Sequence, residues 1–522
     1  MRPQHLLDMA NCVESHSGFI SALTGFVNVL LGGNCNPEII PIFFGGRLIA
    51  LDKKSGGIRP IAIGGTFRRL TAKCASAFAV SKLATLLAPH QLGVGVPGGC
   101  EAAVHATRRF LSSAPNDAVL AKLDFSNAFN SLHRDAMLSA VLEFAPELYK
   151  FCHLAYSRSS FLKFGPHTIL SEEGAQQGDP LGPLCFCLTV HKLLLSLKSQ
   201  LTFGFLDDFT IGGSLSSVSD DVDLIATECA RLGLHLNVGK CELVSHQRNS
   251  LPSNLCKFLF VETPDLTLLG APLFKGRGLD CALDSCCQTL STALVRLTNI
   301  GAHDALTLLR ASFSAPKVMH LLRCAPCVDH IGLTNFDNLL RDGISLVTNT
   351  DLTDLQWLQA SLPVREGGLG VRRVTVLATS AFLASAAGTL HIQEQNLTGC
   401  PGTIVPFVSD FTDRWASLSK VAPLEAPVSS RQAAWDDPLI QVDIALLWNS
   451  FTDHASHARL HAVSAQHSGD WLHALPIASC GLRLDDEAVR VAVGFRLGVN
   501  LCVPHAVSGV ICHQRVDCLI AT

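Results

Sequence analysis

Apolar and polar positions in the first half of the chain follow two periods, one typical of short strands and one typical of helices. Alternating apolar segments bounded by turn residues predict strands at 48–63 with a turn at 53–57, at Val119–Leu123, and at 234–236. Helical spacing predicts helices over about 67–87, 100–113, 127–145 and 184–197. Strands and helices do not alternate regularly, so the pattern predicts an α+β fold with antiparallel strands.

Two aspartates stand between a pair of short apolar segments. Asp207 and Asp208 separate 201–205 from 209–211, a pattern that predicts a hairpin with both carboxylates at its tip. Upstream, the predicted strand Val119–Leu123 ends on Asp124. If the two regions are neighbours in one sheet, three carboxylates converge, and such oxygen ligands suit the two Mg²⁺ ions of nucleotidyl transfer. The other aspartate pairs, at 220–221, 436–437 and 485–486, have the pattern of helix-capping or surface acids.

The second half of the chain has weaker signals. Beyond about residue 278 the pattern is mostly helical and has no internal repeat, and a stretch rich in Pro, Ser and Ala at 421–431 is a candidate linker. We therefore expect four segments: an extension at 1–47, an α+β segment at 48–275, a helical segment at 276–420 and a C-terminal helical segment at 421–522.

Composition indicates a core-rich protein inside the cell. Hydrophobic residues make up 48% of the 522 residues and the mean hydropathy is +0.31, yet the longest apolar runs are too short to span a bilayer. We find no secretory signal pattern at the start of the chain. The twenty cysteines are scattered through apolar segments and are expected to be reduced thiols. We expect no membrane partner, and a location in the nucleus or cytoplasm.

The net charge of −4 conceals a basic region. Residues 45–110 carry ten Lys and Arg against Asp52 and Glu101. Such a region suits a polyanionic substrate and equally suits a solvated basic surface. The basic residues that are candidates for contact with nucleic-acid backbone are Arg68, Arg69, Lys73, Arg108 and Arg109.

The order of the motifs resembles a reverse transcriptase of the non-LTR retrotransposon type over about residues 48–275. The motifs that carry the resemblance are Lys53-Lys54 with Arg59-Pro60-Ile61, Asp124 through Phe129, Gln176 through Leu181, Phe205 through Asp208, Asn237 through Lys240, and Leu268-Leu269-Gly270. The resemblance implies a right-hand polymerase fold with fingers, a palm built on an antiparallel sheet, and a thumb. It implies RNA-directed DNA polymerase activity with an RNA template, a DNA primer and dNTPs as partners, and we infer no protein partner from it.

The same resemblance implies roles for individual residues. Asp124, Asp207 and Asp208 would hold two Mg²⁺ ions, or Mn²⁺ in their place. Lys54 and Arg59 would hold the triphosphate, and Lys240 would protonate the departing pyrophosphate. Phe129 would exclude a 2′-hydroxyl, and the backbone at Gln177 and Gly178 would lie close to the incoming base pair. Phe205 stands where tyrosine is frequent in the family, which bears on primer positioning.

Several of these residues also have an ordinary structural interpretation, without a role in catalysis or binding. Phe129 has the pattern of ordinary helix core, Lys240 of a solvated surface lysine, and Gly178 of a plain loop. The C-terminal residues Cys502, His505, Cys512, His513 and Cys518 are spaced too irregularly to predict a zinc site. The alternative function is a catalytically inactive remnant, or a co-opted nucleic-acid-binding protein, with the polymerase fold.

Overall fold

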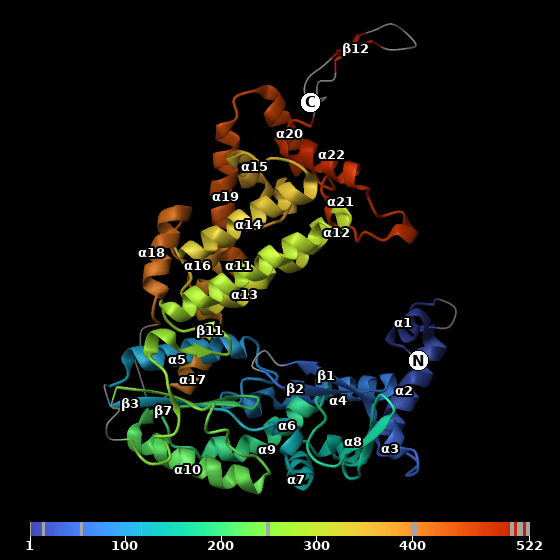
Figure 1. The fold of residues 1–522 in the computed structure, drawn as a ribbon, viewed down its shortest axis with the longest axis vertical. Coiled ribbons are helices and arrows are strands. Elements are labelled where there is room, and N and C mark those ends of the chain that lie inside the picture. Colours follow the sequence, from blue (N-terminus) through green and yellow to red (C-terminus); the bar gives the residue numbers. More distant parts are fainter. Residues whose placement is uncertain are drawn as a thin grey trace. The chain divides into compact units, whose positions relative to one another are not determined.

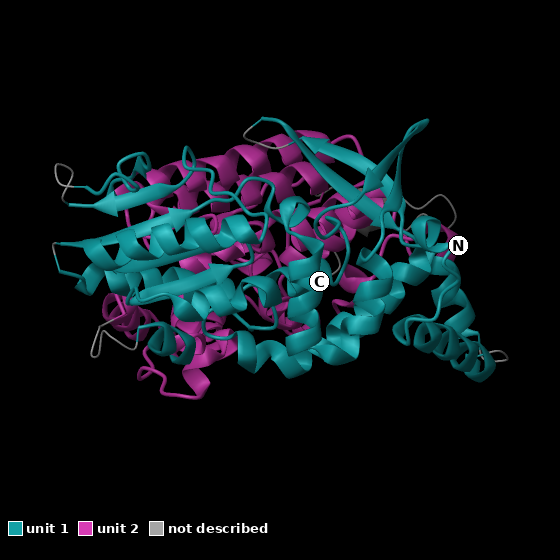
Figure 2. Cartoon of the chain, turned by 90° about the horizontal axis from the view of Figure 1, so that it is seen from below, with its two compact units in different colours: residues 1–262, 391–404 teal, residues 263–390, 405–522 magenta. Residues whose placement is uncertain are grey.

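The chain folds into two compact units in this computed structural model. Unit 1 contains residues 1–262 and 391–404, and unit 2 contains 263–390 and 405–522 (Figure 2). The structure describes residues 2–12, 16–52, 56–115, 117–246, 251–397, 405–501, 506–508 and 515–517. The C-terminal Cys and His residues named above lie outside this set.

A five-stranded sheet forms the centre of unit 1. Its order is β6-β7-β3-β8-β9, and all neighbours are antiparallel except the parallel pair β8 and β9. The strands are β3 (Ala118–Leu123), β6 (Leu201–Phe205), β7 (Asp208–Ser214), β8 (Glu242–Ser245) and β9 (Leu259–Phe260). Four of the six residues of β3 are buried, because helices α9 (Gly182–Ser196) and α10 (Leu215–Arg231) contribute to the same core. The central position of β3 explains its apolar sequence.

A second sheet of unit 1, which contains the labelled strands β1 and β2 (Figure 1), has four strands in the order β2-β1-β4-β5. Its strands are β1 (Gly46–Asp52), β2 (Ile58–Gly64), β4 (Ser160–Phe164) and β5 (His167–Ser171). The β1–β2 hairpin pairs Gly46 with Gly64 and Asp52 with Ile58. This sheet is more exposed than the central one, with four of the five residues of β5 open to solvent.

The remaining elements of unit 1 are helices. They are α1 (Pro3–Asn11), α2 (His16–Leu31), α3 (Ile40–Phe43), α4 (Thr66–Leu87), α5 (Gly99–Ser113), α6 (Ala128–Ser131), α7 (Arg134–Phe144), α8 (Pro146–Tyr156) and α17 (Leu390–Asn396). By length and composition alone, α4 could cross a membrane, as could the bent pair of α17 and the helix before it if these form one span. Core helices pass the same test, and Ala72, Ala75 and Leu87 of α4 are buried in the core of unit 1.

Unit 2 is mostly helical. Its longer helices are α11 (Arg277–Leu297), α13 (Ala315–Cys324), α14 (Ile331–Thr348), α16 (Val374–Gly388), α18 (Val408–Ser419), α19 (Gln432–Ser450), α20 (His454–Ser464) and α22 (Asp486–Leu497). Its shorter ones are α12 (Ala302–Leu308), α15 (Asp354–Ala360) and α21 (Asp470–His473), with a π-helical segment at Leu309–Phe313 and short hairpins β10–β11 (Thr267–Leu268, Ala271–Pro272) and β12–β13 (Ala506–Ser508, Arg515–Asp517). Trp415 and Trp435 pack edge to face in its core.

Most predicted elements are present, and the mixed helix-and-sheet fold with an antiparallel sheet is confirmed. The predicted helix at 127–145 is two helices, α6 and α7, and the predicted strand at 234–236 is a single bridge between Phe125 and Leu236. The boundaries of the compact units differ from the four expected segments. Unit 1 ends at 262 instead of 275 and regains 391–404, while the candidate linker at 421–431 lies inside unit 2.

Candidate active site

Strand pairing brings the three aspartates of the predicted site to one edge of the central sheet. Leu123, which precedes Asp124, pairs with Phe209, and Phe205 pairs with Asp208 across the β6–β7 turn. Leu206 and Asp207 form the two-residue turn, so Asp208 is the first residue of β7 and not part of the tip. The rings of Phe125 and Phe209 pack edge to face, with centroids 5.1 Å apart, next to the aspartates on both strands.

The electrostatics of this edge reflect crowded negative charge. Desolvation and the charge of Asp124 raise the pKa of Asp207, while the positive charge of Arg59 acts in the opposite direction. Desolvation of the carboxyl group, with the charges of Asp207 and Asp124, raises the pKa of Asp208 to about 6, although this residue remains partly open to solvent. Like charges that raise one another's pKa favour either protonation or a bound cation.

A cation is the partner that this donor set fits. Carboxylate oxygens are the ligands that Mg²⁺ prefers. Among the described residues, no group of three or more His, Cys, Asp or Glu side chains is arranged as a complete metal site. The three aspartates therefore supply carboxylate oxygens of the right chemical type, but their described positions do not form such a group.

One of the two basic residues predicted to hold a triphosphate, Arg59, lies on β2. Arg59 is exposed on β2, and its positive charge acts to lower the pKa of Asp207. Lys54 lies outside the described residues. The triphosphate role of both residues stays a prediction.

Phe129 lies in the short helix α6, close to the loop that leads to α9. Its ring is half-buried and packs against the buried ring of Phe186, with centroids 4.9 Å apart. Its carbonyl oxygen accepts a hydrogen bond of 2.8 Å from the amide of Ala175. Phe129 thus contacts the core and is also partly exposed. Its position is compatible with a residue that excludes a 2′-hydroxyl and with an ordinary core residue.

The loop that contains Gln177 and Gly178 is joined to β2. The amide of Ala62 donates a 2.7 Å hydrogen bond to the carbonyl of Gln177. Gly178 has φ +113°, and a Cβ atom there would lie 2.5 Å from the carbonyl oxygen of Ala62. The glycine is therefore required by close approach to the protein's own backbone, a stronger reason than a plain loop would supply.

Lys240 occupies an exposed turn that is attached to the first aspartate. The amide of Asn237 donates a 2.8 Å hydrogen bond to the carbonyl of Asp124, and the amide of Lys240 donates one of the same length to the carbonyl of Asn237. The turn is thereby fixed next to the site, and the exposure of Lys240 leaves its role open.

One charged neighbour of the site was not predicted. Lys122 forms an ion pair with Glu242 on β8, with 2.6 Å between Nζ and Oε2, and its charge lowers the pKa of Asp208. Lys122 and Asp124 stand two residues apart at the end of one strand, so they lie on the same face of the sheet. This spacing was the available signal.

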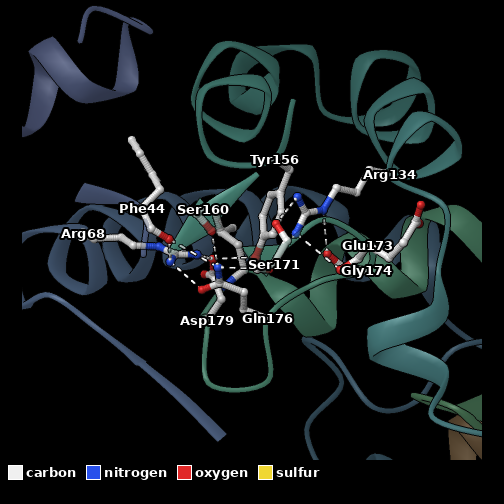
Figure 3. A network of polar contacts seen from close by, with 11 residues as sticks. Phe44, Arg68, Arg134, Tyr156, Ser160, Ser171, Glu173, Gly174, Gln176 and Asp179 are labelled. Carbon is white, nitrogen blue, oxygen red and sulfur yellow. Dashed lines mark hydrogen bonds and ion pairs between the residues drawn. The ribbon is translucent and has the colours of Figure 1, made fainter. Parts of the chain in front are cut away.

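Part of the basic region at 45–110 is structural, because three of the five candidates for contact with nucleic-acid backbone are not on the surface, whereas Lys73 is exposed. Arg68, Arg108 and Arg109 are buried. Arg68 donates hydrogen bonds from Nη1 to Gln176 Oε1 at 2.6 Å and from Nη2 to Asp179 Oδ2 at 2.7 Å (Figure 3). Tyr156 also donates to Asp179 Oδ2, at 2.7 Å. This network attaches the loop before α9 to α4, and it explains why charged residues occur in an apolar stretch.

Comparison with known proteins supports the motif order. Residues 51–270 match the family model described as reverse transcriptase (RNA-dependent DNA polymerase). A 132 kDa protein of the SLACS retrotransposable element of Trypanosoma brucei gambiense is 28% identical over 367 residues, which are 67% of this chain and 30% of that protein. The chain thus spans about a third of the length of this relative.

Solved structures of telomerase give a more distant similarity. Telomerase of Candida albicans, in complex with a fragment of telomeric RNA, aligns with 76% of this chain and 69% of its own at 11% identity, with a TM-score of 0.39. Apo telomerase of Candida tropicalis aligns with 72% of this chain and 68% of its own at 11% identity, with a TM-score of 0.36.

Proposed function

Residues 51–270 belong to the reverse transcriptase family, of the non-LTR retrotransposon type, and from this premise we propose that the chain is an RNA-directed DNA polymerase. It would extend a DNA primer with dNTPs along an RNA template. On this proposal the five-stranded sheet would be the palm and the β1–β2 hairpin part of the fingers. The observation that carries the proposal is the convergence of Asp124, Asp207 and Asp208 at one sheet edge, with pKa values raised at two of them.

Asp124, Asp207 and Asp208 would hold two Mg²⁺ ions, or Mn²⁺. When bound, such ions supply activation of the primer's 3′-hydroxyl and neutralise charge on the phosphates. The carboxylates would bind and orient these ions, because a cation relieves the charge repulsion among the carboxylates of the metal-free site. Arg59 would grip triphosphate oxygens through its guanidinium fork, together with Lys54. Lys240 would donate a proton to the departing pyrophosphate.

Two residues would select the substrate. The exposed part of Phe129 would lie under the sugar and exclude a 2′-hydroxyl, while the Phe186 contact holds the ring in place. The link between Ala62 and Gln177 would keep the nucleotide loop and the fingers strand in register, so that the incoming base pair meets a fixed backbone.

Primer extension on an RNA template tests the proposal. The parent is expected to incorporate dNTPs with Mg²⁺, to stop in EDTA, and to resume when Mg²⁺ is restored. Asp207→Asn and Asp124→Asn should each reduce the rate by at least about a thousandfold, whereas Asp220→Asn, an exposed aspartate on α10, should match the parent. Template binding without extension by the parent would instead favour the inactive or co-opted protein.

A further inference from the structure

The turn that carries Asp207 has an unusual backbone. Phe205 pairs with Asp208, so Leu206 and Asp207 form a two-residue hairpin turn. Leu206 has φ +60°, a left-handed conformation that glycine adopts easily and leucine does not. A branched residue in this conformation costs on the order of 1 kcal/mol or more and persists only where its surroundings hold it.

A single buried side chain holds this residue on both sides. The amide of Leu206 donates to Gln91 Oε1 at 2.8 Å, and Gln91 Nε2 donates to the carbonyl of Leu206 at 3.1 Å. Gln91 Oε1 also accepts from the amide of Gly93 at 3.3 Å. Gln91 is fully buried, and Leu206 and Gly93 are partly buried. Both backbone polar groups of the strained residue are therefore satisfied by one carboxamide.

The backbone around Gln91 is itself attached to the hairpin. The amide of Gly204 donates to the carbonyl of His90, and the amide of Leu92 donates to the carbonyl of Gly204, both at 2.8 Å. This places residues 90–92 along the free edge of β6. The segment lies between α4 and α5, outside every motif discussed above.

Two glycines make room for the arrangement. A Cβ atom at Gly204 would lie 2.9 Å from Gln91 Nε2, and one at Gly93 would lie 2.7 Å from the amide nitrogen of Leu206. Because the second of these contacts is with backbone, a larger residue at 93 would displace the turn. The close approach at the two glycines and the hydrogen bonds of Gln91 thus both fix residues 90–93 against the turn at Leu206.

We propose that Gln91 is a positioning residue for the active site: its carboxamide locks Leu206 in the left-handed conformation and so sets the direction of the neighbouring Asp207 carboxylate. The inference rests on the proposed polymerase function. Gln91 contacts the turn and not the reacting groups, so its loss should leave substrate binding intact. A misplacement of about 1 Å at a reacting group can reduce the rate about a hundredfold.

A double-mutant cycle in the full chain tests this proposal. Gln91→Ala should lower the maximal rate of primer extension by about ten- to a hundredfold, with the KM for dNTPs and the Kd for template within about twofold of the parent. If the role is conformational, Gln91→Ala should change the rate less than about twofold when added to Leu206→Gly, because glycine adopts positive φ without support.

Amide hydrogen exchange gives a readout that does not depend on activity. The Leu206 amide should exchange faster in Gln91→Ala, while amides of β3 keep the rate of the parent. Gln359→Ala is the matched control, because Gln359 is also buried and also donates to backbone carbonyls, of Gly367 and Arg496. If Gln91→Ala does not fold, Gln91→Met keeps the side-chain volume and removes the hydrogen bonds.

The outcomes separate the two proposals. A parent that does not extend primers overturns the polymerase function, and the exchange experiment still decides the role of Gln91. An active parent with a full-rate Gln91→Ala variant, or with equal loss in both Leu206 backgrounds, overturns the positioning role. Unchanged exchange at Leu206 overturns it as well.

Discussion

Asp207 and Asp208 are adjacent in the chain, and desolvation together with the charge of Asp124 raises the pKa of both, with the charge of Asp207 adding to the shift at Asp208. Lys122 and Arg59 offset part of this repulsion, since their charges lower the pKa values of Asp208 and Asp207 respectively. Raised pKa values persist despite both cations. At the scale of single residues, the site therefore carries negative charge that Lys122 and Arg59 offset only in part.

Removing one carboxylate charge should stabilise the metal-free protein. In EDTA at pH 8, Asp208→Asn is expected to increase the free energy of unfolding by up to about 1 kcal/mol, a small value because solvent screens this partly exposed group. Thermal denaturation measures the change. Mg²⁺ should raise the Tm of the parent more than that of the variant. A variant less stable than the parent in EDTA would contradict the repulsion.

The half-buried ring of Phe129 makes a separate prediction about sugar selectivity. Phe129→Ala should reduce discrimination against ribonucleotides by at least about tenfold, because the space under the sugar opens. Competition between each dNTP and its rNTP in primer extension measures it. Phe151→Leu, a core substitution in unit 1, controls for general loosening. Unchanged selectivity together with a lower Tm would assign Phe129 to the core alone.

At the scale of elements, the β1–β2 hairpin and the 176–179 loop are joined, because a backbone hydrogen bond connects β2 to this loop. The Ala62–Gln177 hydrogen bond joins them, and the Arg68–Asp179 ion pair joins the same loop to α4. Side chains of that ion pair are 4% and 3% exposed, so breaking it would leave a buried charge unpaired. The loop therefore has little freedom to move independently of β2.

A methyl group at Gly178 should separate these elements. Gly178→Ala is expected to destabilise the protein by about 1–3 kcal/mol and to raise the KM for dNTPs, because the backbone at Ala62 must shift. Gly165→Ala, on the exposed β4–β5 turn with φ +56° and open space around it, carries only the conformational cost. Equal effects of the two substitutions on KM would show that the contact with Ala62 is unimportant.

At the scale of the whole molecule, unit 1 is completed by a segment from far along the chain. Helix α17 returns to unit 1 after more than a hundred residues of unit 2, and its Gln393 is fully buried. Arg109 of α5 donates from Nη1 to Gln393 Oε1 at 3.3 Å. Burial lowers the pKa of the Arg109 guanidinium, so this charge depends on its polar neighbours.

Gln393→Ala should therefore destabilise unit 1, even though Gln393 is distant in sequence from the rest of that unit. We expect a loss of about 1–3 kcal/mol, because a buried donor of Arg109 loses an acceptor. Chemical denaturation of the full chain measures the loss. Gln395→Ala, an exposed glutamine on the same helix, should change stability by less than about 0.5 kcal/mol. A loss of the same size in both would mean that the helix itself, and not the buried contact, is affected.

Local sequence determined the elements around the site and the candidate carboxylates. The apolar segments on either side of Asp207 and Asp208, and the apolar strand before Asp124, predict β3, β6 and β7 because strand periodicity is a short-range property. The same segments cannot specify which strands pair. The placement of β3 between β7 and β8, which brings Asp124 to the hairpin, is a property of the sheet.

Tertiary structure alone decided the roles of the buried polar residues. Arg68 and Arg109 resemble surface cations in sequence, because a charge run does not indicate whether a distant carboxylate or carboxamide will satisfy it. Gln91 lies in a loop without a recognisable motif, and its proposed role depends on its contact with Leu206, 115 positions away. The left-handed backbone of Leu206 cannot be predicted from the hydrophobic periodicity. Burial and hydrogen bonding join residues that are far apart in the sequence, and the local sequence around one of them does not identify its partner.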